Sequence, residues 1–447
     1  MSNTKSSRLG KSIWFNLVVF GFIGQIAWAV ENVYFNTFLF NYIGGSTSDI
    51  SRMVALSAAT AVITTFLMGA LSDKLAKRKP FICIGYIVWG CVVALFAPIS
   101  RENVASLFNI SDTASVIAVT VSIVIILDCV MTFMGSTGND AAFNAWLTDV
   151  TSEQNRATAE GALAVMPILA TLIVTAAFGA GVTAFGYPAC FLGLGGVVVL
   201  CGIVGLFTIK EVKLEKNTDN SYFADIIYGF RPSVISENKY FYLTLISSCF
   251  FLTAVQVFMP YIFIYIQHYL KFDFNSLLAS LSVKTIIIAA AALIGFIAVV
   301  VICGKMLDKF GKKHFIFPSI AVFIIGLILV SRMESIGKFA LCACVMLCGY
   351  GLLTIILNAA IRDFTPEGKA GLFQGVRMIF AVLIPMVVGS AIGSRVTEAF
   401  ADNHELGTYI NEFGETVNVP VPEIFIFSAI VAVFIVIPIV FLRKKIR

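Results

Sequence analysis

The sequence predicts an all-α membrane protein of twelve transmembrane helices, arranged as two pseudo-symmetric six-helix bundles. Three observations lead to this fold class: the composition, the order of the apolar segments, and a loop sequence that occurs twice. Of the 447 residues, 59% are hydrophobic and 13% are charged, whereas soluble domains are roughly 25% charged. The apolar runs are continuous rather than alternating at every second residue, which favours helices over a membrane barrel.

The sequence contains twelve apolar segments of about the length that a bilayer crossing needs, roughly 20 residues, or longer. In the first half they cover residues 13–43, 51–72, 81–99, 116–148, 159–185 and 188–209, and in the second half 239–270, 276–304, 315–333, 338–361, 370–397 and 423–442. A polar stretch separates the halves. We therefore expect an N-terminal bundle at 1–209, a linker at 210–238 and a C-terminal bundle at 239–447.

The basic residues predict the orientation. Of the 31 Lys and Arg residues, 23 lie on the side of the N-terminus, six lie on the opposite side, and Lys284 and Arg377 lie within spans. Because short cytoplasmic loops carry the excess of Lys and Arg, we expect a multi-pass protein of the cell membrane with both termini in the cytoplasm. The charges are spread over short loops, so the net charge of +5 does not indicate a nucleic-acid partner. We expect a monomer.

One loop sequence interrupts the apolar runs twice, 235 positions apart, with the pattern Gly-x-x-x-Asp-Lys-x-x-Lys-basic. The first copy contains Gly69, Asp73, Lys74, Ala76 and Arg78, and the second contains Gly304, Asp308, Lys309 and Gly311. A repeat at half the chain length indicates a duplicated unit. We expect gating loops in which Asp73 and Asp308 pair with basic side chains or helix ends; ordinary basic loop chemistry is the alternative.

The paired loops resemble the signature between spans 2 and 3, and again between spans 8 and 9, of major facilitator transporters. Residues 24–32, 137–144 and 362–377 further resemble the glycoside-pentoside-hexuronide sugar transporters and their sucrose-transporter-like relatives. This resemblance implies a secondary active transporter that works by alternating access in the lipid bilayer, with a sugar as its small-molecule substrate. It also implies that Glu31 and Asp140 bind sugar hydroxyls, because they match the family's acidic residues of spans 1 and 4.

Charged side chains within a span cost about 2.5–3.5 kcal/mol on insertion scales, so each needs a reason. Around Glu31, the first span carries Gln25, Trp28 and Asn32 on adjoining helix faces. Amides and carboxylates hydrogen-bond hydroxyls, and an indole packs on a sugar ring. These residues are therefore candidates for substrate binding, with a polar contact between helices as the alternative.

The fourth span carries a polar stripe that includes Asp128, Asn139 and Asp140. Twelve residues separate Asp128 from Asp140, about 18 Å of helix, so the two cannot hold one small group together. Asn139 joins Asp140 as a substrate candidate. Asp128 is a candidate proton carrier or ion-pair partner.

In the second half, Gln256, Asn358 and Gln374 are the candidates for lining a central cavity. Arg377 lies about two turns into its span, where it can pair with a buried carboxylate or extend to the membrane surface.

Sodium-coupled members of the resembled family carry two aspartates one turn apart in span 2, and Ala61 and Thr65 stand at those positions here. A sodium ion there would lack compensating charge, so we expect a proton gradient to drive transport, with no cofactor and no metal. Two other functions remain open. The first is transport of an amphiphile such as a lysolipid or an exported drug, to which the 40 phenylalanines point. The second is a sensor or membrane enzyme, but no metal-ligand set, phosphate loop or Ser–His pairing supports it, and we expect no catalytic residues.

Overall fold

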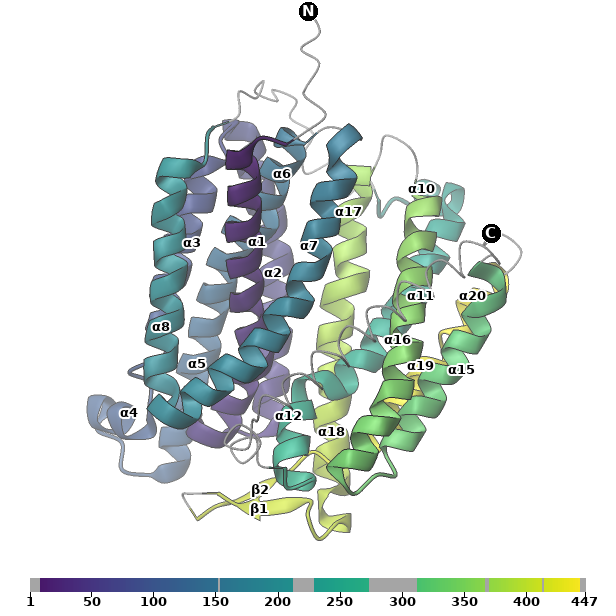
Figure 1. Cartoon of the computed structure of the whole chain (residues 1–447). Coiled ribbons are helices and arrows are strands. Elements are labelled where there is room, and N and C mark those ends of the chain that lie inside the picture. Colours follow the sequence, from purple (N-terminus) through teal and green to yellow (C-terminus); the bar gives the residue numbers. More distant parts are fainter. Residues whose placement is uncertain are drawn as a thin grey trace, which may run out of the picture. The chain divides into compact units, whose positions relative to one another are not determined.

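The structure, a computed structural model, describes residues 9–151, 153–211, 229–272, 312–365, 370–411 and 414–442. Within these ranges the chain is almost entirely helical (Figure 1). Nine helices of the described part are long and apolar enough to cross a membrane, and α3 is a shorter apolar helix. The predicted all-helical membrane fold is confirmed. The predicted span at 276–304 lies outside the described residues.

Contacts between Cα atoms divide the chain into two compact units. The first comprises Met1–Gly45 and Leu56–Tyr222, and the second comprises Ser46–Ala55 and Phe223–Arg447. The division after residue 222 falls within the stretch expected to be a linker. The first turns of the second span group with the second unit, which the sequence pattern did not predict.

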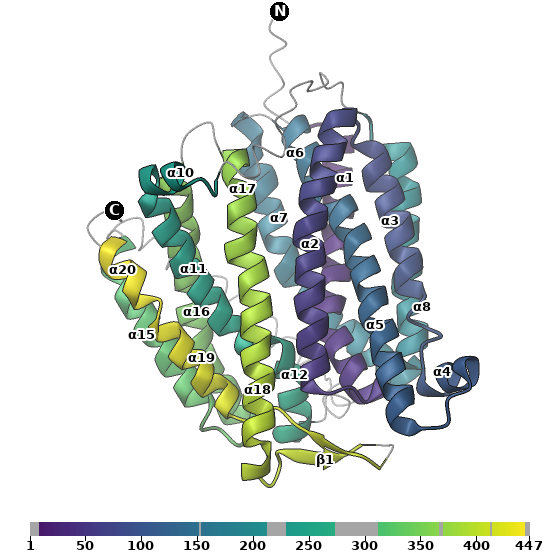
Figure 2. The ribbon, with the colours of Figure 1, turned by 180° about the vertical axis from the view of Figure 1, so that it is seen from behind.

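In the first unit the long helices run side by side as one bundle, and Figure 2 shows α2 and α5 from the side that is hidden in Figure 1. The long helices are α1 Lys11–Val30, α2 Thr47–Leu75 (in this unit from residue 56 on), α3 Lys79–Ala94, α5 Thr113–Gly135, α7 Glu153–Ile173 and α8 Gly179–Thr208. The short helices α4 Arg101–Phe108 and α6 Asn144–Val150 lie at opposite ends of this bundle.

Helices α3 and α8 pack closely because glycines face each other. A Cβ atom at Gly90 would lie 2.5 Å from the carbonyl oxygen of Gly195, and one at Gly195 would lie 2.5 Å from that of Gly90. Two turns further along α8, a Cβ at Gly202 would lie 2.8 Å from the Cys83 carbonyl. Small residues at helix interfaces allow this approach in membranes, where the hydrophobic effect does not drive helices together.

The outward faces of the helices stay apolar. Phe207 on α8 is 83% exposed and Ile126 on α5 is 64% exposed. Such surfaces are stable against lipid but not against water, and every backbone polar group of a helix is satisfied internally. The exposed apolar side chains thus agree with the lipid environment that the composition predicts.

Several helices contain π-helical segments, which widen the turn locally. In the first unit these are η1 Glu31–Phe35, η2 Phe38–Ile43, η3 Ser136–Phe143 and η4 Val174–Phe178. A single wide turn of this kind is frequent at functional sites. Gly186, with φ +78°, bends α8 between the two spans predicted at 159–185 and 188–209.

The helices of the second unit lie around α11, and a two-stranded hairpin stands between α18 and α19 in the chain (Figure 2). They are α10 Pro232–Glu237, α11 Lys239–Phe258, α12 Ile262–Ile264, α15 Lys312–Val330, α16 Ile336–Phe364, α17 Ala370–Met378, α18 Ser390–Phe400, α19 Glu423–Val433 and α20 Val436–Leu442. Strand β1 Thr408–Ile410 pairs antiparallel with β2 Thr416–Asn418. Pro260 lies in a 3-10 turn after α11, and Pro385 begins the π-helical segment η8 Pro385–Gly389.

Candidate functional site

Glu31 lies at the first position of η1, directly after α1, and is held by hydroxyl groups from two other helices of the first unit. Ser57 on α2 donates a hydrogen bond of 2.9 Å to Glu31 Oε1, and Thr132 on α5 donates one of 3.3 Å to the same oxygen. The two hydroxyl oxygens are themselves 2.7 Å apart. Three spans therefore meet at this carboxyl.

Asp128 belongs to the same cluster. Its side chain is 1% exposed. Glu31 and Asp128 lie close enough to interact electrostatically. Among the described residues, neither Glu31 Oε2 nor Asp128 Oδ1 has a hydrogen-bond partner, although both atoms are buried.

Asp140 lies in η3, three turns along the same span. Its carboxylate accepts a 2.9 Å hydrogen bond from Ser136, and it also acts electrostatically on Glu31. Both Glu31 and Asp140 thus occupy π-helical segments, whose wider turns change the direction in which a side chain projects. The three acidic side chains of the predicted site lie in one unit, and Glu31 interacts electrostatically with each of the other two.

The aromatic and amide candidates of the first span differ from one another in burial and in the groups that they contact. Trp28 is half-buried and packs on Trp89 of α3, with ring centroids 5.0 Å apart. Gln25 is half-buried, whereas Asn32 is exposed and donates to the carbonyl oxygen of Trp28 at 2.7 Å. One indole face of Trp28 is therefore already in contact with protein.

Asn139 is 4% exposed and joins helices. Its amide donates to the Tyr86 hydroxyl at 2.6 Å, and Tyr86 donates to the Phe20 carbonyl at 2.7 Å. Gly24 makes this approach possible, because a Cβ there would lie 2.1 Å from the Asn139 amide nitrogen. In this structure the Asn139 amide connects α1, α3 and η3.

The candidates of the second unit are spread over three helices. Gln256 on α11 is half-buried beside Gly389, where a Cβ would lie 2.6 Å from the Gln256 Cβ. Asn358 on α16 is exposed, and Arg377 near the end of α17 is partly buried. The side chain of Gln374 lies outside the described part.

The first of the paired loops is organised by Arg78, which is 6% exposed. Its guanidinium pairs with Asp73 at 2.5 Å and Asp149 at 2.9 Å, while its backbone N–H donates to the Glu211 carboxylate at 2.6 Å. Burial lowers the pKa of Arg78, but hydrogen bonds and charge from Asp149 and Asp73 raise it above its ordinary value. This loop thus connects the ends of α2, α6 and α8.

The sequence did not reveal Asp149 or Glu211 as partners of this loop, because both are far along the chain. Ala76 has φ +51°, a left-handed conformation that favours glycine. Gly311 stands at the equivalent position of the second copy. That second copy, with Gly304, Asp308, Lys309 and Gly311, lies outside the described residues.

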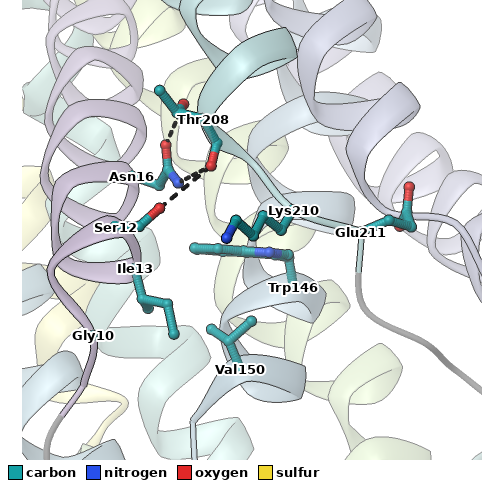
Figure 3. Close-up of a pocket in the computed structure, with 9 residues that line it drawn as sticks. All are labelled: Gly10, Ser12, Ile13, Asn16, Trp146, Val150, Thr208, Lys210 and Glu211. Carbon is teal, nitrogen blue, oxygen red and sulfur yellow. Dashed lines mark hydrogen bonds between the residues drawn. The ribbon is translucent and has the colours of Figure 1, made fainter.

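A separate cavity of about 310 Å³ opens where α1 begins and α8 ends (Figure 3). It is lined by Gly10, Ser12, Ile13, Asn16, Trp146, Val150, Thr208, Lys210 and Glu211. Asn16 donates to the Thr208 carbonyl at 3.0 Å and accepts from the Thr208 hydroxyl at 2.6 Å. None of the predicted binding residues lines this cavity.

No group of three His, Cys, Asp or Glu side chains that could hold a metal ion occurs among the described residues. At the position of the resembled family's sodium site, Ala61 has no ligand atom in its side chain. Thr137 matches the threonine of span 4 that binds sodium in the resembled family, and here its hydroxyl donates to the carbonyl of Phe133 in its own helix, at 2.7 Å.

Apolar helices that enclose carboxyl and hydroxyl groups are the arrangement of a membrane transport protein. The family model described as Major Facilitator Superfamily matches residues 17–390 and 280–446. The chain therefore belongs to the Major Facilitator Superfamily, whose members carry out secondary transport.

Curated relatives match over short stretches. The uncharacterized MFS-type transporter YwoD of Bacillus subtilis (strain 168) is 29% identical over 107 residues, which are 22% of this chain and 24% of that protein. An uncharacterized MFS-type transporter of Mycobacterium tuberculosis is 27% identical over 107 residues, 24% of this chain and 15% of that protein. The match thus spans a quarter or less of these relatives' length.

Solved structures match over nearly the whole chain. The nucleoside transporter NupG has a TM-score of 0.63 at 12% identity, with 97% of this chain and 99% of that chain covered. A bacterial homolog of the human lysosomal transporter Spinster, in an inward-facing state, has a TM-score of 0.61 at 14% identity, with 97% of both chains covered. Both likenesses establish the fold.

Proposed function

We propose that the protein is a proton-driven secondary transporter of a sugar or glycoside in the cell membrane, with both termini in the cytoplasm. One observation supports the proposal that protons drive transport: the spans of the first unit contain three acidic side chains. These spans enclose Glu31, Asp128 and Asp140, and Glu31 interacts electrostatically with each of the two aspartates. Carboxyl groups that face no cation inside a membrane protein are where protons are taken up and released.

The sequence shows that no basic side chain is available nearby along these spans. Between Lys11 and Lys74 the only Lys, Arg or His is Arg52, and it pairs with Asp49 at 3.4 Å with its side chain 69% exposed. Between Lys79 and Arg156 the only one is Arg101, whose guanidinium donates to the Ile43 carbonyl. The carboxyl groups therefore have no basic neighbour along their own spans, which supports neutralisation by a proton from solution.

The chemistry of the same region supports a polyhydroxylated cargo. Asp140 offers carboxylate oxygens, and the first span offers the half-buried amide of Gln25 and the half-buried indole of Trp28. Hydroxyl groups of a sugar bind to such acceptors and donors, and the apolar face of its ring packs on aromatic side chains. NupG is a nucleoside transporter. Because a nucleoside contains a pentose, glycosides should be among the first substrates tested.

Uptake into proteoliposomes tests the proposal. Labelled monosaccharides, disaccharides, nucleosides and a lysophospholipid are offered with and without an inward proton gradient. We expect accumulation of a sugar or glycoside only with the gradient. Accumulation that follows a sodium gradient, or transport of the lysophospholipid alone, would overturn the proposal.

A further inference from the structure

We propose that the cavity where α1 begins and α8 ends binds a phosphate ester, a ligand that the proposed transport function does not require. The cavity has a volume of about 310 Å³, and all the residues that line it belong to the first unit (Figure 3). The class of ligand follows from the hydrogen-bonding groups of the lining that have no partner.

Most polar side chains of the lining already have partners. The Asn16 amide and Thr208 form two hydrogen bonds with each other, and the Ser12 hydroxyl donates to the Thr208 carbonyl at 3.5 Å. The Glu211 carboxylate accepts from the backbone N–H of Arg78 at 2.6 Å, and Figure 3 shows this carboxylate directed away from the other lining side chains. These groups are therefore satisfied without a ligand.

Two donors of the lining have no partner among the described residues. Trp146 is 2% exposed, and its indole N–H donates to no acceptor there, although a buried tryptophan N–H ordinarily finds one. Lys210 follows α8, and Figure 3 shows its ammonium group directed toward α1. Because both groups can only donate, the ligand that completes them is an acceptor, and the ammonium charge favours an anion.

The start of α1 adds positive potential to the same cavity. Its N-cap residue is Gly10, which has no side chain to accept from the first backbone N–H groups of the helix. These N–H groups and the helix dipole make a helix N-terminus suitable for binding phosphate. A Cβ atom at Gly10 would meet no heavy atom of the described residues within 4 Å beyond its chain neighbours, so there is space for a ligand beside this N-terminus.

The apolar part of the lining suits the carbon portion of an ester. Ile13 on α1 and Val150 on α6 contribute aliphatic side chains. A phosphate group has acceptor oxygens for the indole, the ammonium and the helix N–H groups at once, and lysine binds phosphate as a point charge. Since a phospholipid headgroup and a soluble phosphate monoester share this chemistry, both are tested.

Tryptophan emission and thermal melts of the purified, delipidated full-length protein in neutral detergent and phosphate-free buffer test this inference. The probes are sn-glycerol 3-phosphate, a soluble ester, and dihexanoylphosphatidylglycerol, a short-chain lipid. Glycerol and dihexanoylglycerol, at equal ionic strength, are the controls without phosphate. The chain has four tryptophans, so Trp146→Phe identifies the emission of the lining indole. Trp14→Phe is the matched control, because Trp14 does not line the cavity.

We expect at least one probe to give a saturable emission change that is absent in Trp146→Phe and kept in Trp14→Phe. The same probe should raise the melting temperature by mass action, and by less in Trp146→Phe. A response to glycerol 3-phosphate assigns the site to a soluble ester, and a response to the phosphatidylglycerol alone assigns it to a lipid headgroup. The proposal is overturned if neither probe gives a saturable response, or if the phosphate-free controls give the same one.

Two further variants separate loss of binding from loss of fold. The dissociation constant should rise at least 10-fold in Lys210→Gln and in Gly10→Asp, and stay unchanged in Lys77→Gln, an exposed lysine outside the lining. Gly10→Asp places a carboxylate at the start of α1 and also caps that helix, so its melting temperature without a probe should not fall. Equal dissociation constants in Lys210→Gln, Gly10→Asp and Lys77→Gln would contradict the proposal. The assay uses neither a gradient nor a sugar, so its failure does not affect the proposed transport function.

Discussion

The Arg78 loop provides the sharpest test of what stabilises the first unit. Arg78→Gln removes the guanidinium from Asp149, which is 17% exposed, and from Asp73, which is 46% exposed. A hydrogen bond to a charged group contributes about 1.5–3 kcal/mol, and the exposed Asp73 pair contributes at most about 1 kcal/mol. We therefore expect a loss of about 2–4 kcal/mol in the free energy of unfolding.

For a unit of this size, 1 kcal/mol corresponds to about 2–4 °C, so the melting temperature of the detergent-solubilised protein should fall by roughly 5–15 °C. Lys77→Gln is the matched control, because Lys77 is exposed in the same loop. Asp149→Asn should cost more than Asp73→Asn, in the order of their burial. Equal melting temperatures for Arg78→Gln and Lys77→Gln would refute the interpretation of Arg78 as the centre of this loop.

Three smaller changes test other contacts. Gly24→Ala should destabilise the protein by about 1–3 kcal/mol in a thermal melt, because the new Cβ would displace the amide of Asn139; an unchanged melt would contradict that close approach. Ala76→Gly should raise stability by up to about 1 kcal/mol, because φ +51° is strained for alanine, and a lower melting temperature would argue against this. Ser136→Ala removes the hydrogen bond to Asp140 and should weaken apparent substrate affinity about 5- to 10-fold in uptake assays, at a cost of about 1–1.5 kcal/mol; unchanged affinity would separate Asp140 from the cargo.

Composition and spacing were sufficient to predict the class of fold. The apolar runs gave the helices, and the boundary at Gly186 falls between two of the predicted spans. The pattern could not predict that the first turns of α2 group with the second unit. The unit to which a segment belongs depends on its packing against segments that are distant in the chain. The hydropathy pattern contains no information about such packing.

The candidate site was only partly visible in the sequence. Glu31, Asp128 and Asp140 stand out because charge is costly within a span, and the structure brings their side chains into one unit. Ser57 was missed, because one hydroxyl in a span can bond to its own helix and is ordinary. Its spacing from Thr60 and Thr64, three and then four residues, marks one helical face and was the available signal.

The twelve residues between Asp128 and Asp140 also limited what the sequence could show. Their separation along the helix is about 18 Å in a regular α-helix, which argued against a shared site. Glu31 interacts with both carboxyl groups from a neighbouring span. A third side chain can therefore link groups that one helix keeps apart.

Proton movement during transport tests the central claim most directly. Proteoliposomes in weakly buffered medium receive the solute that the uptake panel identifies, and the external pH is followed. We expect the medium to become alkaline on solute addition for the unmodified protein and for the control Asp112→Asn, in which an exposed helix cap is replaced by another capping residue. We expect it to stay constant for Asp128→Asn. Solute entry without alkalinisation in the unmodified protein, or undiminished alkalinisation in Asp128→Asn, would contradict the account.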